Sequence, residues 1–322
     1  MVLGFPEHGK LKRVLMHAPG NELNLIKPAS FSRYLFEDAI DQVQFRWQHE
    51  RLVERLRAEG VDVVLLEELL TNPRQLSLIE RSPNLVYTRD TVTVTPAGYM
   101  GMMMKSSIRR RETWIVTAAM RQLNMQSIVD IETPGTMEGG DLIFLDEETL
   151  LVGIGNRTNR LGLRQLQERT RKRELRTLIS IPLPPTVLHL DGTMMIVDED
   201  LAIVHHQSLS QPATVFEGGK PVKHENPVVF LKKRGFRLIE VTAYERQRRA
   251  TNVITLRPRK LIGYSGNPRV RNMLTKEGVD FIEIEGSELV RGGGGPRCMT
   301  APIERDWRRS FNQTATSIDE VS

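Results

Sequence analysis

The segment LVRGGGGPRCMTAP, residues 289–302, contains the only cysteine of the chain, Cys298, just behind four consecutive glycines. Glycines have no Cβ, so they let a backbone pass very near a ligand or another strand. A cysteine in such a place is a candidate nucleophile if a neighbouring acid–base group, commonly a histidine, can activate it. A lone cysteine is otherwise a small buried hydrophobe, so the assignment depends on the residues that accompany Cys298.

Three polar clusters accompany the cysteine, each at the start of an apolar run. They are Asn84, Arg89 and Asp90 in SPNLVYTRDTVTV, Glu138 and Asp141 in TMEGGDLIFLD, and His189 and Asp191 in VLHLDGTMMIVD. His189 and Asp191 are two residues apart, hence on the same side of an extended segment. Each cluster also has a structural reading as a turn or a core histidine. Their occurrence together with Cys298 favours a catalytic site.

The elements that must position these residues follow a repeated pattern of helix end, glycine and short apolar strand. It occurs in AEGVDVVLL (58–66), KRGFRLIEV (233–241) and KEGVDFIEI (276–284), and in RQLNMQSIVDI (121–131) with Asn124 in the place of the glycine. A residue with positive φ at this point lets the chain reverse from helix into sheet. The irregular spacing excludes a solenoid, and the pattern predicts one α/β domain built from several similar modules.

Further elements are predicted from hydrophobic periodicity. Residues 32–59 have helical spacing, with Ser32 as cap and Gly60 as the stop. Short apolar runs predict strands at LKRVLMHAP, TVTVTP, DLIFLD, TLLVGI, TMMIVD, LAIVHH, NVITL and KLIGYS. The run GGGG is not followed by GK[ST], so a nucleotide-binding phosphate loop is not expected.

Composition narrows the class of protein. The chain has 322 residues, 39% of them hydrophobic and 26% charged, and a formal charge of +5. One cysteine excludes an intramolecular disulfide, and neither a signal peptide nor a membrane-spanning run is evident, so we expect a cytoplasmic protein without a membrane partner. The basic clusters 109–111 and 169–176 have few aromatic residues nearby, so no nucleic-acid partner is expected, and we interpret the second cluster as a solvated helical face.

Taken together, PNLVYTRD, MEGGD, HLDGT and GSELVRGGGGPRCMT resemble the arginine deiminase branch of the guanidino-group-modifying superfamily, from about residue 10 to residue 304. The resemblance implies an α/β fold of the pentein type, a propeller of five ββαβ-like modules around a pseudo-fivefold axis. It also implies one catalytic domain over residues 1–311. We expect the polar segment 312–322 to be a disordered tail.

The resemblance assigns roles to the catalytic residues. Cys298, as thiolate, would attack the guanidinium carbon and form a covalent thiouronium, while Asp90 and Asp191 grip the guanidinium nitrogens. His189 would protonate the departing ammonia and then activate water, with Glu138 orienting the imidazole. The substrate brings its own positive charge, so neither a metal nor another cofactor is expected. The implied activity is hydrolysis of L-arginine to citrulline and ammonia.

Five residues are implied to bind the substrate: Asn84, Arg109, Arg157, Asp141 and Arg297. For Arg109 the competing interpretation is a place in a basic surface run. The family arginine five residues before the cysteine is replaced here by Gly293, with Arg291 two residues earlier, so the carboxylate clamp is expected to differ. The chain also lacks sequence for the family's helical insertion between YLFEDAI and PNLVYTRD.

Other functions stay open at this point. A related arginine dihydrolase would give ornithine, carbon dioxide and two ammonias. An amidinotransferase generally carries Asp where this chain has Glu138, and a dimethylarginine hydrolase usually lacks the acid found here as Asp191. A basic binding protein on a degenerate scaffold is the remaining alternative, and a homo-oligomer is possible for any of these activities.

Overall fold

The computed structural model describes residues 4–171 and 175–306. The tail predicted for residues 312–322, like residues 172–174 of the basic segment, lies outside this part of the chain. The helices of the described residues are α1 (Gln42–Ala58), α2 (Leu66–Leu69), α3 (Pro73–Ile79), α4 (Arg110–Gln122), α5 (Arg160–Thr170), α6 (Pro227–Lys233), α7 (Ala243–Gln247) and α8 (Pro268–Lys276). None of these helices has the length and apolar composition needed to cross a membrane.

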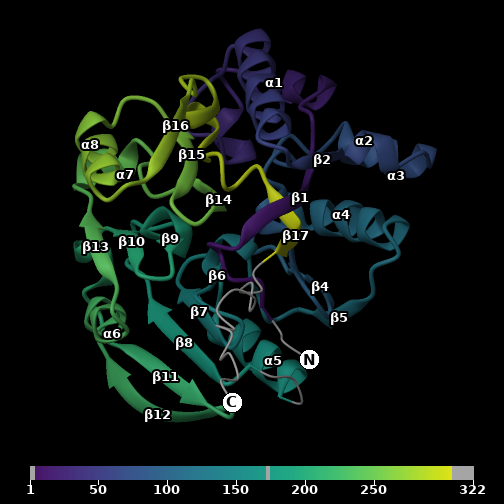
Figure 1. The fold of residues 1–322 in the computed structure, drawn as a ribbon. Coiled ribbons are helices and arrows are strands. Elements are labelled where there is room, and N and C mark those ends of the chain that lie inside the picture. The colour runs from purple at the N-terminus through teal and green to yellow at the C-terminus, as the bar shows by residue number, and fades with distance from the viewer. Residues whose placement is uncertain (1–3, 172–174, 307–322) are drawn as a thin grey trace, which may run out of the picture.

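The strands of the described residues form five small sheets (Figure 1). Four have three strands: β17 (Ala301–Asp306), β1 (Lys10–Met16) and β2 (Asp62–Leu65); β3 (Val92–Thr95), β4 (Gly98–Gly101) and β5 (Ser127–Asp130); β9 (Met194–Asp198), β10 (Leu201–Val204) and β13 (Arg237–Glu240); β14 (Ile254–Arg257), β15 (Lys260–Tyr264) and β16 (Asp280–Ile284). The fifth is β6 (Leu142–Phe144), β7 (Thr149–Ile154) and β8 (Thr177–Pro182), extended by β11 (Ala213–Glu217) and β12 (Lys220–Glu225).

Every sheet contains the same three-strand unit. The central strand (β1, β4, β7, β10 or β15) pairs antiparallel with one neighbour and parallel with the other. A helix, α1, α4, α5, α6 or α8, lies between each central strand and its parallel partner, as a parallel crossover requires. The α/β class is therefore confirmed. The sheets are separate, and strand pairing does not close them into a ring.

One sheet is completed by strands from opposite ends of the chain. β17 pairs antiparallel with β1, with Lys10 opposite Asp306 and Leu15 opposite Ala301. In Figure 1 the yellow β17 crosses beside the purple β1 near the middle of the molecule. In the other four units the antiparallel neighbour directly precedes the central strand.

The reversals predicted between helix and strand are confirmed. Gly60, Gly235 and Gly278 have φ values of 77°, 88° and 73°, and Asn124 has φ 57°. These residues lie between a helix and the strands β2, β13, β16 and β5, respectively. Asparagine tolerates this left-handed conformation better than most residues, which explains why it can replace glycine there. The eight predicted strands are also present, whereas β4, β8, β11, β12 and β17 were not predicted.

The predicted helix over residues 32–59 is wrong in its first third. Helix α1 begins at Gln42, where the Asp41 carboxylate accepts hydrogen bonds from Val43 N (2.9 Å) and Gln44 N (3.1 Å). The preceding 3-10 helix, Phe31–Tyr34, ends at Leu35 with φ 63°. Glu37 N then donates to Arg291 O at 2.8 Å. This bond holds the segment against the glycine-rich loop, so the segment does not continue the line of α1.

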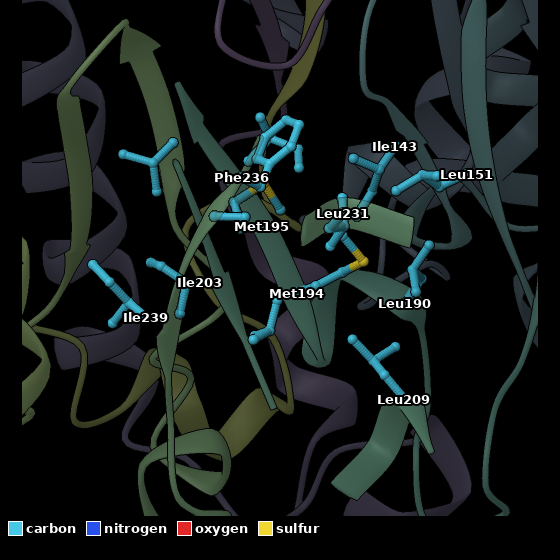
Figure 2. Close-up of a cluster of buried hydrophobic side chains, with 14 of the residues drawn as sticks. Ile143, Leu151, Leu190, Met194, Met195, Ile203, Leu209, Leu231, Phe236 and Ile239 are labelled. Atoms are coloured by element: carbon cyan, nitrogen blue, oxygen red, sulfur yellow. The ribbon is translucent and has the colours of Figure 1, made fainter. Parts of the chain in front are cut away.

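The largest hydrophobic cluster surrounds β9 and β10 (Figure 2). Met194, Met195 and Ile203 are fully buried there. Burying side chains of this size stabilises the fold by about 1.5–3 kcal/mol each. Leu190, which separates His189 from Asp191 in the sequence, belongs to the same cluster. The core therefore fixes the turn that carries two of the predicted catalytic residues.

Candidate active site

Four predicted site residues lie in equivalent places in four of the five units. Each polar group directly precedes the strand that pairs antiparallel with the central strand: Asp90 ends the 3-10 helix η3 (Thr88–Asp90) before β3, Asp141 ends η5 (Gly139–Asp141) before β6, Asp191 lies in η6 (Leu190–Gly192) before β9, and Cys298 lies shortly before β17. In the fifth unit the equivalent residue is Asn252, shortly before β14. Five separate sheets thus each contribute to one group of polar residues.

Asp90 and Cys298 of this group line a cavity of about 290 Å³, whereas Asp141, Asp191 and Asn252 are not in its lining. Six predicted site residues line it: Asn84, Asp90, Arg109, Arg157, His189 and Cys298. The remaining wall comes from the segment that includes Ser32 and Glu37, from Tyr87 and Leu188, and from Gly292–Gly294. The volume suits a small molecule.

The glycine run packs against the aromatic ring of Tyr87, whereas the sequence predicted a close approach to a ligand or another strand. A Cβ at Gly292 would lie 2.0 Å from Tyr87 Oη, and one at Gly294 would lie 2.3 Å from Tyr87 Cε1. Gly293 between them has φ 92°, which side-chain-bearing residues rarely adopt. Larger residues would therefore displace the loop that leads to Cys298.

Cys298 lies at the inner wall of the cavity with 8% of its surface exposed. Asn252 Nδ2 donates to Sγ at 3.1 Å, and Cys298 N donates to Asn252 Oδ1 at 3.3 Å. Sγ also lies 3.8 Å from Asp191 Oδ2. Burial and the nearby carboxylates of Asp191 and Asp90 raise the pKa of the thiol well above its usual range. The free protein therefore holds a neutral thiol, and a bound cation would favour its ionisation.

His189 is held between two acidic residues. Its Nε2 lies 2.9 Å from Glu138 Oε2, and its Nδ1 lies 3.7 Å from Asp90 Oδ1. Burial by itself lowers the pKa of the imidazole, but Asp90 and Glu138 outweigh that effect and raise it above its usual value. Although burial raises the pKa of Glu138, the bond to His189 lowers it overall. The pair is therefore an imidazolium donating to a carboxylate.

Arginines also pair with the catalytic carboxylates. Arg109 NH1 donates to Asp90 Oδ2 at 2.7 Å, and Arg157 NH1 donates to Glu138 Oε2 at 3.1 Å. Arg109 is 3% exposed, so its interpretation as part of a basic surface run is wrong. Asp90 Oδ1 is buried and has no hydrogen-bond partner among the described residues. That oxygen is available to an N–H donor in the cavity.

Two predicted substrate-binding residues are not in the cavity wall. Asp141 accepts from Thr158 Oγ1 at 2.6 Å and from Leu190 N at 2.9 Å, and burial raises its pKa to about 7. Arg297 is fully buried, and its NH1 donates to Asp191 Oδ2 at 2.9 Å. Both residues support the turn of His189 and Asp191 from behind. The geometry therefore favours a role in positioning this turn over the predicted contact with substrate.

A metal ion is the other ligand to consider for these groups. Single ligand atoms of Asp90, Glu138 and His189 lie within 4.8 Å of one another. Arg109 and Arg157, however, already direct guanidinium groups at the two carboxylates, and His189 is protonated. The donor set therefore suits an organic cation that can share N–H bonds better than a bare metal ion.

Sequence reasoning missed two residues of the site. Asn252 forms hydrogen bonds with the nucleophile. Like Asp90, Asp141 and Asp191, it is a polar residue just before a buried strand, and this position could have identified it. Glu112 is buried and accepts from Arg109 Nε at 2.8 Å. Burial raises the pKa of Glu112 to about 7. Its spacing of three residues from Arg109 on a helical turn was the available signal.

Comparison with known proteins places this geometry in a family. Residues 72–305 match the arginine deiminase family. The arginine deiminase of Staphylococcus haemolyticus is 25% identical over an alignment of 399 positions, which covers 93% of this chain and 97% of the relative. The protein YkgA of Bacillus subtilis is 29% identical over 302 positions, covering 93% and 94%. The longer alignment agrees with the prediction that this chain is shorter than arginine deiminases.

Solved structures show the same fold. A dimethylarginine dimethylaminohydrolase from Pseudomonas aeruginosa, solved with citrulline, has a TM-score of 0.70 at 23% identity and covers 91% of this chain and 99% of its own. The N-terminal domain of ArgZ, an arginine dihydrolase of cyanobacteria, has a TM-score of 0.72 at 15% identity, covering 91% and 98%. Both have the pentein fold. By the extent of its sequence match, the chain belongs to the arginine deiminase family and is a guanidino-group hydrolase.

Proposed function

We propose that this protein hydrolyses L-arginine to citrulline and ammonia through a covalent intermediate on Cys298. The observation that carries the proposal is the cavity lined by a buried thiol, a protonated His189 and Asp90, whose Oδ1 has no hydrogen-bond partner among the described residues. Such a site offers a nucleophile, an acid and an anionic anchor to a planar cation. Arginine deiminases that align over nearly their whole length support arginine as the substrate.

The first half of the reaction follows from these positions. The substrate guanidinium binds with its N–H groups directed to Asp90 and Asp191, and its charge lowers the pKa of the Cys298 thiol. The thiol releases its proton to solvent, and Sγ, as thiolate, attacks the guanidinium carbon and gives a neutral tetrahedral adduct. His189 transfers a proton to one nitrogen, the C–N bond breaks, and ammonia leaves. The remaining species is an S-linked thiouronium.

The second half reverses the proton transfer. Neutral His189 takes a proton from water, whose oxygen attacks the thiouronium carbon. The C–S bond then breaks, the hydroxyl proton of the adduct passes to Sγ, and the thiol and the ureido product separate. Glu138 keeps the imidazole oriented throughout by its 2.9 Å contact with Nε2.

The far end of arginine requires a partner for its carboxylate. Arg157 is the best placed cation, because its side chain is 12% exposed and lines the cavity. Asn84 and Arg109 line the same wall. Arg291 does not take the place of the arginine absent at Gly293, since its NH1 donates to Ala39 O at 3.0 Å outside the cavity lining.

The proposal includes the arrangement of the units. We infer that the five ββαβ units surround one pseudo-fivefold axis within a single catalytic domain, residues 1–311. Residues from four of the units line the cavity, and Asn252 of the fifth unit donates to Cys298 Sγ in its wall. We also infer that the protein is cytoplasmic, that its substrate is a small molecule and that it has no nucleic-acid partner.

The test is to incubate purified protein with L-arginine and to quantify citrulline, ornithine and ammonia together. Equal citrulline and ammonia are expected. Ornithine with twice as much ammonia would make the protein a dihydrolase with the same catalytic residues. Absence of all three products, with a Cys298→Ser sample as background, would contradict arginine as the substrate.

A further inference from the structure

A second group of charged residues lies directly behind the active site. Three arginines, Arg89, Arg297 and Arg305, surround the carboxylate of Glu7. All four residues are buried, with 7% exposure or less. Arg297 donates to both oxygens of Glu7 at 3.1 Å, whereas Arg89 NH2 and Arg305 NH2 lie 3.7 Å from Glu7 Oε1. Arg297 therefore takes most of the charge of Glu7.

The positive charge of this cluster exceeds its negative charge by one. The three arginines face Glu7, and Arg297 also pairs with Asp191 at 2.9 Å, so three positive charges meet two negative ones. Burying an uncompensated charge is costly. Burial and the neighbouring arginines lower the pKa of Arg89 to about 9 and that of Arg305 to about 10, the direction expected for excess positive charge.

Two of the three arginines, Arg89 and Arg305, line a small cavity. Arg89 Nε, Arg89 NH2 and Arg305 NH2 are buried without a hydrogen-bond partner among the described residues, and so is Thr93 Oγ1. Arg89, Thr93 and Arg305 line a cavity of about 20 Å³, as does Glu7. The rest of the wall is apolar and includes Val92, Val94, Leu142, Phe144 and Pro302. Because one water requires about 10–15 Å³ on this measure, the cavity has room for one water-sized particle and not for a phosphate or carboxylate.

We propose that this cavity is a binding site for one monatomic anion, chloride in ordinary salt, held by Arg89, Arg305 and Thr93. A water molecule would satisfy some of the donors but would leave the excess charge uncompensated. The anion lies next to two turns of the active site. Arg89 precedes Asp90, and Arg89 N donates to Cys298 O at 3.1 Å. Anion binding therefore stabilises the two turns that present Asp90 and Cys298.

The direct test uses bromide, which replaces chloride and scatters anomalously. Crystals of the whole chain are transferred to sodium bromide, and data are collected at the bromine edge. An anomalous peak between the Arg89 and Arg305 guanidinium groups is expected. Density at this place without an anomalous signal would show a water molecule and overturn the proposal.

A solution test compares thermal unfolding in sodium chloride and in sodium gluconate at equal ionic strength. At tenfold excess over the dissociation constant, chloride is expected to raise the midpoint by about 2 °C or more. Thr93→Val and Arg89→Met should reduce this chloride-specific shift, whereas the exposed-residue control Arg74→Met should keep it. If Arg89→Met does not fold, Thr93→Val decides.

Equal midpoints in the two salts for the natural chain would overturn the proposal. A full chloride shift in both variants would place the anion elsewhere and would overturn it too. These measurements need no turnover, so they are independent of the activity on arginine.

Discussion

Asn252 binds Cys298 at two points, through Nδ2 to Sγ at 3.1 Å and through Oδ1 to the backbone N at 3.3 Å. The two residues belong to different sheets, so this amide connects the nucleophile to a neighbouring unit. A donor directed at sulfur stabilises the thiolate relative to the thiol. Asn252 thus opposes the effect of burial on the pKa of Cys298.

Asn252→Ala is expected to reduce kcat/KM by about 10–100-fold, because both bonds to Cys298 are lost. Asn252→Asp should reduce it further, since a carboxylate beside sulfur disfavours the thiolate. The rate of thiol alkylation as a function of pH measures the change directly. The exposed-site variant Asn24→Ala should match the natural chain. Unchanged alkylation in Asn252→Ala would remove Asn252 from thiol activation.

Cys298→Ser is expected to lower turnover by at least about 1,000-fold. A serine hydroxyl is much less acidic than a thiol, and His189, which is protonated, cannot take up its proton. The substituted oxygen fits the space of sulfur, so the thermal midpoint should change by no more than about 2 °C. Product analysis and circular dichroism test the two statements. Activity near that of the natural chain would contradict covalent catalysis by Cys298.

Two glycines that flank His189 in space or in sequence provide a matched pair of variants. A Cβ at Gly140 would lie 2.7 Å from His189 Nδ1, whereas a Cβ at Gly192 meets nothing within 4 Å. Gly140→Ala is therefore expected to displace the imidazole and to lower kcat/KM by about 100-fold. Gly192→Ala should lower it by less than about threefold. Equal activities would mean that the position of His189 tolerates the added methyl group.

The sequence was most informative where local rules dominate. The positive φ of Gly60, Gly235, Gly278 and Asn124 could be predicted because helix-to-strand reversal requires a left-handed residue. The limit of helix α1 could not, because Asp41 and Ser32 are both acceptable caps and long-range bonds decide between them. Glu37 N and Asp38 N donate to Arg291 O, and Asp41 N donates to Glu288 Oε2.

Site residues could be predicted where the residue type itself indicates a reactive group. Cys298 and His189 are reactive residue types, and the resemblance to a family assigned their partners. Glu112 was missed because a helical glutamate is usually solvated, and only its burial against Arg109 gives it a role. The resemblance assigned Arg297 to substrate binding, and the sequence could not correct this because it does not show to which side of a loop a side chain points.

The pH dependence of stability is expected to reflect His17 at the end of β1. Its Nε2 lies 3.0 Å from Glu22 Oε1, and its Nδ1 pairs with Glu67. Burial lowers the pKa of His17, but the two glutamates outweigh it and raise the pKa to about 9. The imidazolium stabilises the fold fully below about pH 6.5, and this contribution disappears as the pH rises through 9.

Urea unfolding between pH 6 and pH 9.5 measures this contribution. The natural chain should lose about 3 kcal/mol of unfolding free energy more over this range than His17→Gln, which cannot titrate there. His224→Gln, at an exposed position, should retain the slope of the natural chain. Parallel curves for the natural chain and His17→Gln would exclude a charged His17 in the folded state.

The pairing of β1 with β17 has a consequence for biosynthesis. The nucleophile lies shortly before the last described strand, and that strand completes the sheet begun by the first. A ribosome-bound chain therefore has neither a finished first sheet nor a nucleophile in place until residue 306 has left the exit tunnel. Catalysis therefore cannot begin before β17 has been synthesised and has paired with β1, and a chain cleaved before β17 would lose both its activity and the strand that completes this sheet.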